Sequence, residues 1–347
     1  MRGPPAVPLR WLRLVALLAV VSAAARAFEP LPERPVDPPD NPTTAAKVAL
    51  GKTLFFDPRL SVDGTVSCNS CHNVMAGGDD NRPASMGVRG QLGGRSAPTV
   101  WNAAFLSVQF WDGRAPSLEE QAKGPMINPV EMGDPNHTAV TTRLSGIAGY
   151  APLFERAFGG AEVTIDRIAQ AIAAYERTLV TPDSPLDRYL KGDKTALTAA
   201  QQRGMAAFAD TGCVSCHSGP AFAGPALPAG QGFYQKFPAF PGSAYDSRYD
   251  LMSDLGRYQA THAEADKHFF RVPSLRNVAL TAPYFHNGAV PTLAEAVRVM
   301  AKVQLDKDLD DARVENIVAF LEALSGTFPD QEMPRLPPTP GRTAFAP

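Results

Sequence analysis

Two short stretches of sequence, Cys68-Asn69-Ser70-Cys71-His72 and Cys213-Val214-Ser215-Cys216-His217, decide how this chain is built. Together they contain all four of its cysteines. Two thiols at positions i and i+3 can bond the two vinyl groups of one haem, and the histidine that follows can then bind the haem iron. The sequence therefore predicts two covalently bound c-type haems. The residues expected to hold them are Cys68, Cys71, His72, Cys213, Cys216 and His217.

Residues 1–27 have the composition of an export signal. Arginines at the start precede a short apolar run, residues 14–25, and Ala25-Arg26-Ala27 has the form of a cleavage site. The apolar run is too short to span a bilayer comfortably. We therefore expect a signal peptide over residues 1–27 and an exported chain that begins at Phe28; an uncleaved anchor is the alternative.

Two other uses of four cysteines are common. Exported proteins place them in disulfides, and paired Cys-x-x-Cys motifs bind zinc. The histidine directly after each pair favours thioether attachment of haem over disulfides. The 145-residue separation of the two motifs, together with the export signal, disfavours a shared zinc site.

The charge of the exported chain differs from that of the whole sequence. The full chain has 33 Lys and Arg against 35 Asp and Glu, and residues 1–27 hold four arginines and no acidic residue. The exported part therefore has 29 basic and 35 acidic residues, a net charge of −6 with histidine neutral. This charge argues against a nucleic-acid partner and favours a partner with a basic face.

Helical periodicity dominates the rest of the chain, and no strong alternating strand pattern is present. Helices are expected over residues 44–55, 164–179, 198–208, from 292 onward and around 314–324. A helix followed by Cys-x-x-Cys-His occurs twice, and Thr181-Pro182-Asp183-Ser184-Pro185 breaks the chain between the two occurrences. The pattern predicts a mainly α protein with an N-terminal haem domain over residues 28–183, a C-terminal haem domain over 184–333 and a Pro-rich tail over 334–347, disordered or draped on the surface.

Five further motifs carry a specific resemblance. They are Leu54-Phe55-Phe56-Asp57-Pro58-Arg59-Leu60-Ser61, Phe110-Trp111-Asp112-Gly113-Arg114-Ala115, Ser117-Leu118-Glu119-Glu120-Gln121-Ala122-Lys123-Gly124-Pro125, Asn128-Pro129-Val130-Glu131-Met132-Gly133 and Val272-Pro273-Ser274-Leu275-Arg276-Asn277. With them, residues 45–326 resemble the bacterial di-haem cytochrome c peroxidase family, which also contains the MauG-type enzymes. The resemblance implies two cytochrome c-like domains with one haem each.

The resemblance also implies an activity and a location. The chain is expected to be a periplasmic oxidoreductase that reduces hydrogen peroxide to water. Its electrons would come from a small exported cytochrome c or copper protein that binds transiently. Members of the family are often homodimers, so a homodimer is a further expectation.

The resemblance assigns roles at the first haem. Glu131 matches the carboxylate that moves protons on the peroxide side, a task for which an acid–base group is required. Gln121 and Pro125 match residues that line the same pocket. Trp111 matches a tryptophan that stands between the two haems and relays electrons.

The second haem requires a sixth ligand. The peroxidases of the family use a methionine at the position of Met300, and His/Met ligation raises the potential of a haem. MauG-type members instead use a tyrosine from the segment Ala282-Pro283-Tyr284-Phe285-His286, so Tyr284 is the competing ligand. Met300 favours the peroxidase branch.

Two departures from the family pattern are visible. A calcium ion between the haems would take oxygen ligands, and Thr281 and Pro283 match backbone donors, but Ser96 replaces the family's asparagine. The loop Ser85-Met86-Gly87-Val88-Arg89-Gly90 lacks the histidine that blocks the first iron in many members. We therefore expect the first haem iron to be five-coordinate or water-bound even in the oxidised protein.

Two rival functions remain at this point. One is a MauG-like oxidase that modifies a partner protein. The other is a di-haem electron carrier without peroxide chemistry. The axial ligand of the second haem distinguishes a peroxidase from the MauG-like oxidase. The response to peroxide distinguishes it from the electron carrier.

Overall fold

The main helices begin at polar side chains that bond their first free backbone amides. The computed structural model describes residues 28–339, 341 and 343–345, so the predicted signal peptide lies outside the described residues. The threonines at the start of four expected helices all act as N-caps; they are Thr44, Thr164, Thr198 and Thr292. The helix expected over 164–179 ends earlier, at Glu176, and the one expected over 198–208 continues to Thr211.

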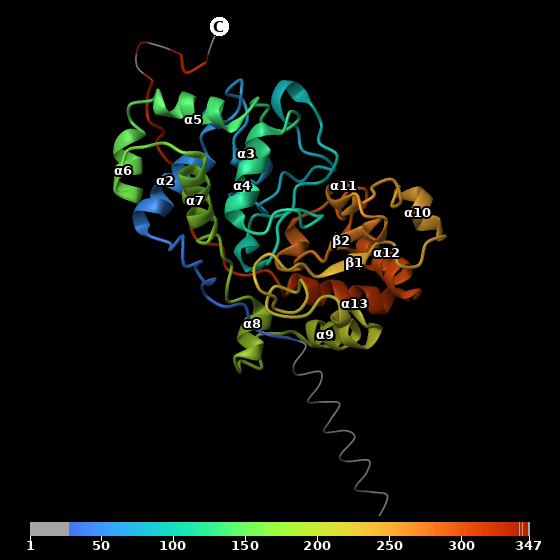
Figure 1. The fold of residues 1–347 in the computed structure, drawn as a ribbon. Helices are drawn as coiled ribbons and strands as arrows, with labels where there is room; N and C mark the ends of the chain where they lie inside the picture. Colours follow the sequence, from blue (N-terminus) through green and yellow to red (C-terminus); the bar gives the residue numbers. More distant parts are fainter. Residues whose placement is uncertain (1–27, 340, 342, 346–347) are drawn as a thin grey trace, which may run out of the picture.

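The first body of the fold surrounds one core cluster (Figure 1). Its helices are α2 (Ala45–Phe55), α3 (Cys68–Cys71), α4 (Leu118–Ile127), α5 (His137–Ser145), α6 (Ala151–Phe158) and α7 (Ile165–Glu176). Helix α7 packs against both α2 and α4. Gly51 permits the closest approach, because a Cβ at this position would lie 1.8 Å from the carbonyl oxygen of Ala171.

The second body repeats this arrangement. Its helices are α8 (Pro185–Leu190), α9 (Ala199–Thr211), α10 (Ala244–Arg248), α11 (Tyr258–Thr261), α12 (Leu293–Leu305) and α13 (Asp311–Glu322). A Cβ at Gly204 in α9 would lie 1.8 Å from the carbonyl oxygen of Asn316 in α13, just as Gly51 meets α7. In both bodies, therefore, a glycine-bearing helix packs closely on a later helix and leads into a Cys-x-x-Cys-His segment, which bears out the predicted repeat.

Extended structure is confined, in the described part of the chain, to one small sheet. Strand β1 (Tyr234–Lys236) pairs antiparallel with β2 (Phe269–Arg271), with Gln235 opposite Phe270. The fold is therefore mainly α, as expected. None of the helices among the described residues is long and apolar enough to cross a membrane.

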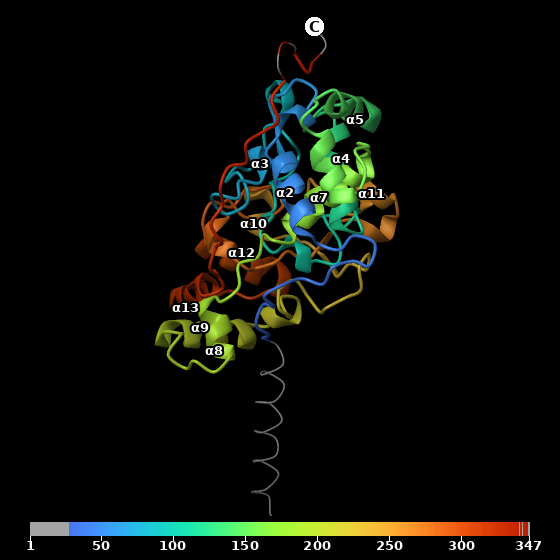
Figure 2. The same ribbon diagram turned by 90° about the vertical axis from the view of Figure 1, so that its left-hand side faces the viewer.

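The two ends of the described chain cross between the bodies (Figures 1 and 2). Phe28 packs with three aromatic side chains of the second body, Phe208, Phe222 and Phe320. The C-terminal segment runs back along the first body, where Phe328 packs edge-on against Trp101. Each body therefore contains core residues supplied by the opposite end of the chain.

The tail that follows is anchored at two further places. The carbonyl oxygen of Pro337 accepts a hydrogen bond from Arg59 at 2.8 Å. The Arg143 guanidinium lies over the ring of Phe345, 5.4 Å from its centroid. The described part of the Pro-rich tail is thus draped on the first body.

Candidate active site

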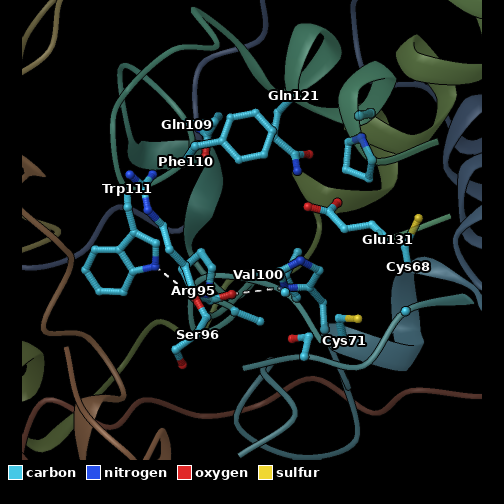
Figure 3. Close-up of a pocket in the computed structure, with 18 of the residues that line it drawn as sticks. Cys68, Cys71, Arg95, Ser96, Val100, Gln109, Phe110, Trp111, Gln121 and Glu131 are labelled. Carbon is cyan, nitrogen blue, oxygen red and sulfur yellow. Dashed lines mark hydrogen bonds between the residues drawn. The ribbon is translucent and has the colours of Figure 1, made fainter. Parts of the chain in front are cut away.

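A cavity of about 630 Å³ opens in the first body between α3, α4 and α7 (Figure 3). Cys68, Cys71 and His72 line it, as the sequence predicts for a haem site. A second cavity, of about 80 Å³, lies in the second body and is lined by Cys213, Cys216 and His217. Each Cys-x-x-Cys-His segment therefore faces its own cavity.

The local fold presents both thiols of the first segment on one helical turn. Ser67 and Ser70 form a capping box that starts α3, so Cys68 and Cys71 stand one turn apart. None of the four cysteines is in a disulfide. Burial raises the pKa of Cys71 to about 11, and likewise raises that of Cys213 to about 11, so these sulfurs are thiols rather than reactive thiolates.

The two histidines are oriented for iron through their second nitrogen. The Nδ1–H of His72 donates to the carbonyl oxygen of Pro98 at 3.0 Å, and that of His217 donates to Phe222 at 3.0 Å. Burial lowers the pKa of both imidazoles, which favours their neutral form. A hydrogen bond at Nδ1 fixes the tautomer that leaves Nε2 free to bind a metal.

The second cavity also carries an unpaired cation. Arg271 is 5% exposed and lines this cavity, but its guanidinium bonds only to the backbone carbonyls of Phe110 and Val272. No carboxylate among the described residues lies within ion-pair distance of it. Buried charges are normally paired, and a haem brings two propionate carboxylates. The donor set and this cation therefore fit a c-type haem.

Glu131 follows α4 and faces the first cavity. Its carboxylate accepts a hydrogen bond from Asn128 at 2.8 Å. Burial raises the pKa of Glu131, and the Arg114 charge opposes this shift only in part. Gln121 lines the same cavity, and Figure 3 shows its amide and the Glu131 carboxyl pointing toward one another. The structure brings together the three residues expected at this pocket, because Pro125 lines it too.

Trp111 lines both cavities. Its indole N–H donates to the carbonyl oxygen of Ser96 at 2.9 Å, which fixes the plane of the ring. In Figure 3 the indole lies on the side of the first cavity opposite Glu131. One aromatic side chain therefore contacts both candidate haem sites.

Met300 and Tyr284 differ in their relation to the second cavity. Met300 in α12 lines it. Tyr284 is buried and paired through a β-bridge with Val290, and it is not among the described residues that line either cavity.

Among the residues expected at calcium, the Ser96 side chain already has a hydrogen-bond partner. The Ser96 hydroxyl donates to the carbonyl oxygen of Arg82 at 3.2 Å. The Asn81 amide donates to the carbonyls of Leu280 and Ala282, on either side of Thr281, at 3.3 and 3.0 Å. Across residues 28–339, 341 and 343–345, no cluster of three or more His, Cys, Asp or Glu side chains suits a metal ion. Calcium binding through Ser96, Thr281 and Pro283 stays a prediction.

The loop that lacks a histidine is held against the candidate acid–base residue. Val88 is fully buried, and its N–H donates to the carbonyl oxygen of Glu131 at 2.9 Å. A Cβ at Gly87 would lie 1.9 Å from the carbonyl oxygen of Val130, so the loop backbone lies directly on this segment. The loop and Glu131 thus form one packed unit.

Among the cavity residues that sequence reasoning missed are two charged ones, Glu176 and Arg271. Glu176 ends α7 and lines the first cavity. A signal was present, because Glu176 continues the i, i+4 row of Ile168 and Ile172 on the buried face of the helix. For Arg271 no comparable signal exists in a three-residue strand.

Comparison with known proteins agrees with this geometry. The model of the di-haem cytochrome c peroxidase family matches residues 45–195, and a cytochrome c-like family model described as RoxA-like matches residues 270–303. The cytochrome c551 peroxidase of Pseudomonas aeruginosa is 47% identical over 92% of this chain and 90% of its own length. A second cytochrome c551 peroxidase, from Nitrosomonas europaea, is 44% identical over 96% of this chain and 95% of its own length.

A solved structure has the same fold. It is a MauG-like protein associated with microbial copper homeostasis, and it superposes with a TM-score of 0.72. The two share 28% sequence identity, and the match covers 87% of this chain and 94% of that one. This identity is well below that of the two peroxidases.

Proposed function

Because the chain belongs to the di-haem cytochrome c peroxidase family, we propose that it reduces hydrogen peroxide to water with electrons from a small redox protein. Cleavage of the O–O bond consumes two electrons and two protons and yields two waters. Two reduced donor molecules, each giving one electron, are oxidised for each peroxide. The observation that carries the proposal is Glu131, which faces the His72 cavity beside Gln121.

The chain's own residues would hold the two haems in distinct ways. Cys68, Cys71 and His72 would bind one, with the opposite side left to peroxide. Cys213, Cys216 and His217 would bind the other. Met300, which lines that second cavity, would close its sixth position. Bound haem supplies the redox chemistry: it binds peroxide and stores electrons.

Glu131 would carry out the proton transfer. A carboxylate can take a proton from one peroxide oxygen and return it to the other, the leaving oxygen. Burial raises the pKa of Glu131, which makes the carboxylate a stronger base than an exposed one. The Asn128 amide holds one carboxyl oxygen in place. Gln121 would orient the peroxide from α4.

Trp111 would connect the two sites. Its ring lines both cavities and is fixed by the hydrogen bond to Ser96. Electrons would enter at the second body, where ligation by His217 and Met300 would raise the potential, and would reach the first body beside this indole.

The position of Met300 also supports a peroxidase over a MauG-like oxidase. The oxidase would require Tyr284 as axial ligand, and Tyr284 is paired with Val290 away from the cavity lining. The donor would be a small cytochrome c or copper protein of the periplasm. A basic face on that donor would suit the net charge of −6 that the chain carries beyond residue 27.

The decisive experiment is an absorption spectrum of the haem-loaded protein, oxidised and half-reduced, before and after peroxide. A peroxidase should change its spectrum rapidly with peroxide and oxidise a reduced small cytochrome c catalytically. Glu131→Gln should slow both processes. A protein whose absorption spectrum does not change when peroxide is added would be an electron carrier instead.

A further inference from the structure

Glu176 is a buried carboxyl group on the wall of the first cavity, and one of its two oxygens lacks a hydrogen-bond partner in the described part of the protein. Its side chain lines the cavity and the residue is 6% exposed. Its Oε2 has no hydrogen-bond partner, and no basic side chain forms an ion pair with it among the described residues. A buried, unpartnered carboxylate would cost several kcal/mol. The Glu176 carboxyl is therefore expected to be protonated, or to form a hydrogen bond with a group that enters the cavity when haem is bound.

A second carboxyl group, that of Glu119, lies close enough to Glu176 to raise its pKa. Glu119 in α4 is partly exposed and accepts hydrogen bonds from Arg177 at 2.5 Å and from Asn41 at 2.7 Å. Although burial opposes the shift, these two donors lower the pKa of Glu119 and keep it ionised. Arg177 is thus already engaged by Glu119, while its Nη1 remains unpartnered. The Arg177 guanidinium therefore forms an ion pair with Glu119 and only a weaker electrostatic attraction to Glu176.

The other groups around Glu176 do not neutralise it. From α2, Lys47 is bonded to Asn41 rather than to Glu176. From α3, Cys68 contributes a sulfur that haem attachment would consume. Burial first, and the charge of Glu119 second, raise the pKa of Glu176 to about 8, and the charge of Arg177 opposes this shift only in part. Glu176 therefore carries a proton at neutral pH.

Peroxide reduction requires protons inside this cavity. Glu131 can move a proton from one peroxide oxygen to the other, but the two protons that enter the product waters must come from elsewhere. We infer that Glu176 is a second proton-carrying group of the first cavity, which releases a proton during peroxide reduction and takes up another from solvent beside Glu119. This inference rests on the proposed peroxidase function.

The proton on Glu176 can be observed directly. Infrared spectra of the haem-loaded wild type at pH 7 should contain the C=O band of a protonated carboxyl, and Glu176→Gln should lack it. Glu120→Gln is the matched control, because Glu120 lies next to Glu119 in α4 but is half exposed and pairs with Lys123. This control should keep the band. Identical spectra for wild type and E176Q would overturn the inference.

Transfer of the proton has a kinetic test. When reduced protein is mixed with peroxide, E176Q should react more slowly by on the order of a hundredfold, the lower end for a proton-transfer group. The wild-type rate should fall as the pH rises past about 8, the pKa of Glu176, and E176Q should not show this fall. Equal rates and equal pH profiles would overturn the inference alone. A wild type that peroxide does not oxidise would instead overturn the proposed function.

If the E176Q variant does not load haem, the wild-type protein alone still tests the inference. Its carboxyl band should disappear on titration with a midpoint near 8, the pKa of Glu176. A band that is absent at pH 7, or that disappears near the titration of an ordinary glutamate, would overturn the inference.

Discussion

The amide N–H of Val88 donates to the carbonyl oxygen of Glu131 at 2.9 Å. This bond connects the loop that lacks a histidine to the residue proposed to move protons. The Val88 side chain is fully buried in the core of the first body, so the loop is held by packing as well as by the hydrogen bond. The position of Glu131 therefore depends on a side chain that never enters the cavity.

Replacement of Val88 by alanine should weaken the packing of the loop of residues 85–90 against Glu131. Loss of two buried methyl groups should lower the free energy of unfolding by about 1–3 kcal/mol. Denaturant unfolding of the haem-loaded protein measures this change, and the peroxide reaction should slow in parallel because Glu131 is less well placed. Val36→Ala is the control, because Val36 is 93% exposed and should change neither quantity.

The oxidised protein should react with peroxide without prior reduction. No histidine in the loop can occupy the first iron, so its electron paramagnetic resonance spectrum should contain a high-spin signal from the first haem. A first haem that is entirely low-spin when oxidised would contradict this prediction.

Glu131→Gln should slow the peroxide reaction by on the order of 10²- to 10⁴-fold. The amide keeps the shape of the side chain and the contact with Asn128 but cannot accept the proton. Because burial raises the pKa of Glu131, the wild-type rate should decline on the acid side at a higher pH than the titration of an exposed glutamate. Stopped-flow rates against pH test both points. An unchanged haem spectrum in the variant excludes a loss of haem.

Met300 and Tyr284 can be separated by one pair of variants. Met300→His should alter the absorption spectrum and potential of the second haem, because the new ligand is a stronger donor than a thioether. Tyr284→Phe should leave both unchanged. The opposite pattern would favour the oxidase.

The free energy of unfolding should depend on pH through Glu176. Its folded-state pKa, about 8, lies above the ordinary value of 4.5, so the folded protein binds the proton more tightly than the unfolded chain. This contribution to stability is fully present below pH 4.5 and is lost as the pH rises toward 8. As the pH rises across this window, the free energy of unfolding of Glu176→Gln should therefore increase relative to that of the wild type, by at most about 1.4 kcal/mol per pH unit. Unfolding curves at several pH values measure the difference.

Arg271 should raise the potential of the second haem. A buried positive charge disfavours the more positive, oxidised state, so Arg271→Met should lower the measured potential, whereas Arg271→Lys should largely retain it. Arg248→Met is the control, because this arginine is 66% exposed and pairs with Glu295 at the surface. Potentiometric titration of the holoprotein compares the three variants.

The residues that the sequence identifies correctly carry local signals. Thr198 and Gln201 form the predicted capping box within four positions, and the i, i+3 spacing of Cys68 and Cys71 is visible in five consecutive residues, so neighbouring residues suffice in both cases. Glu176 is different, because its burial depends on how α7 packs against α2 and α4. The packing of Phe28 on Phe320 depends on residues almost three hundred positions apart. Such relationships follow from the tertiary fold and leave no mark in a local pattern.

The crossing of the two chain ends has a consequence for synthesis and assembly. Phe28 is made among the first of the described residues, yet its partner Phe320 is made among the last. Neither body can close around its core until nearly the whole chain has been produced. A shortened chain that ends before Phe320 would therefore leave both cores incomplete, because it would lack the partner of Phe28 in the second body and the partner of Trp101 in the first.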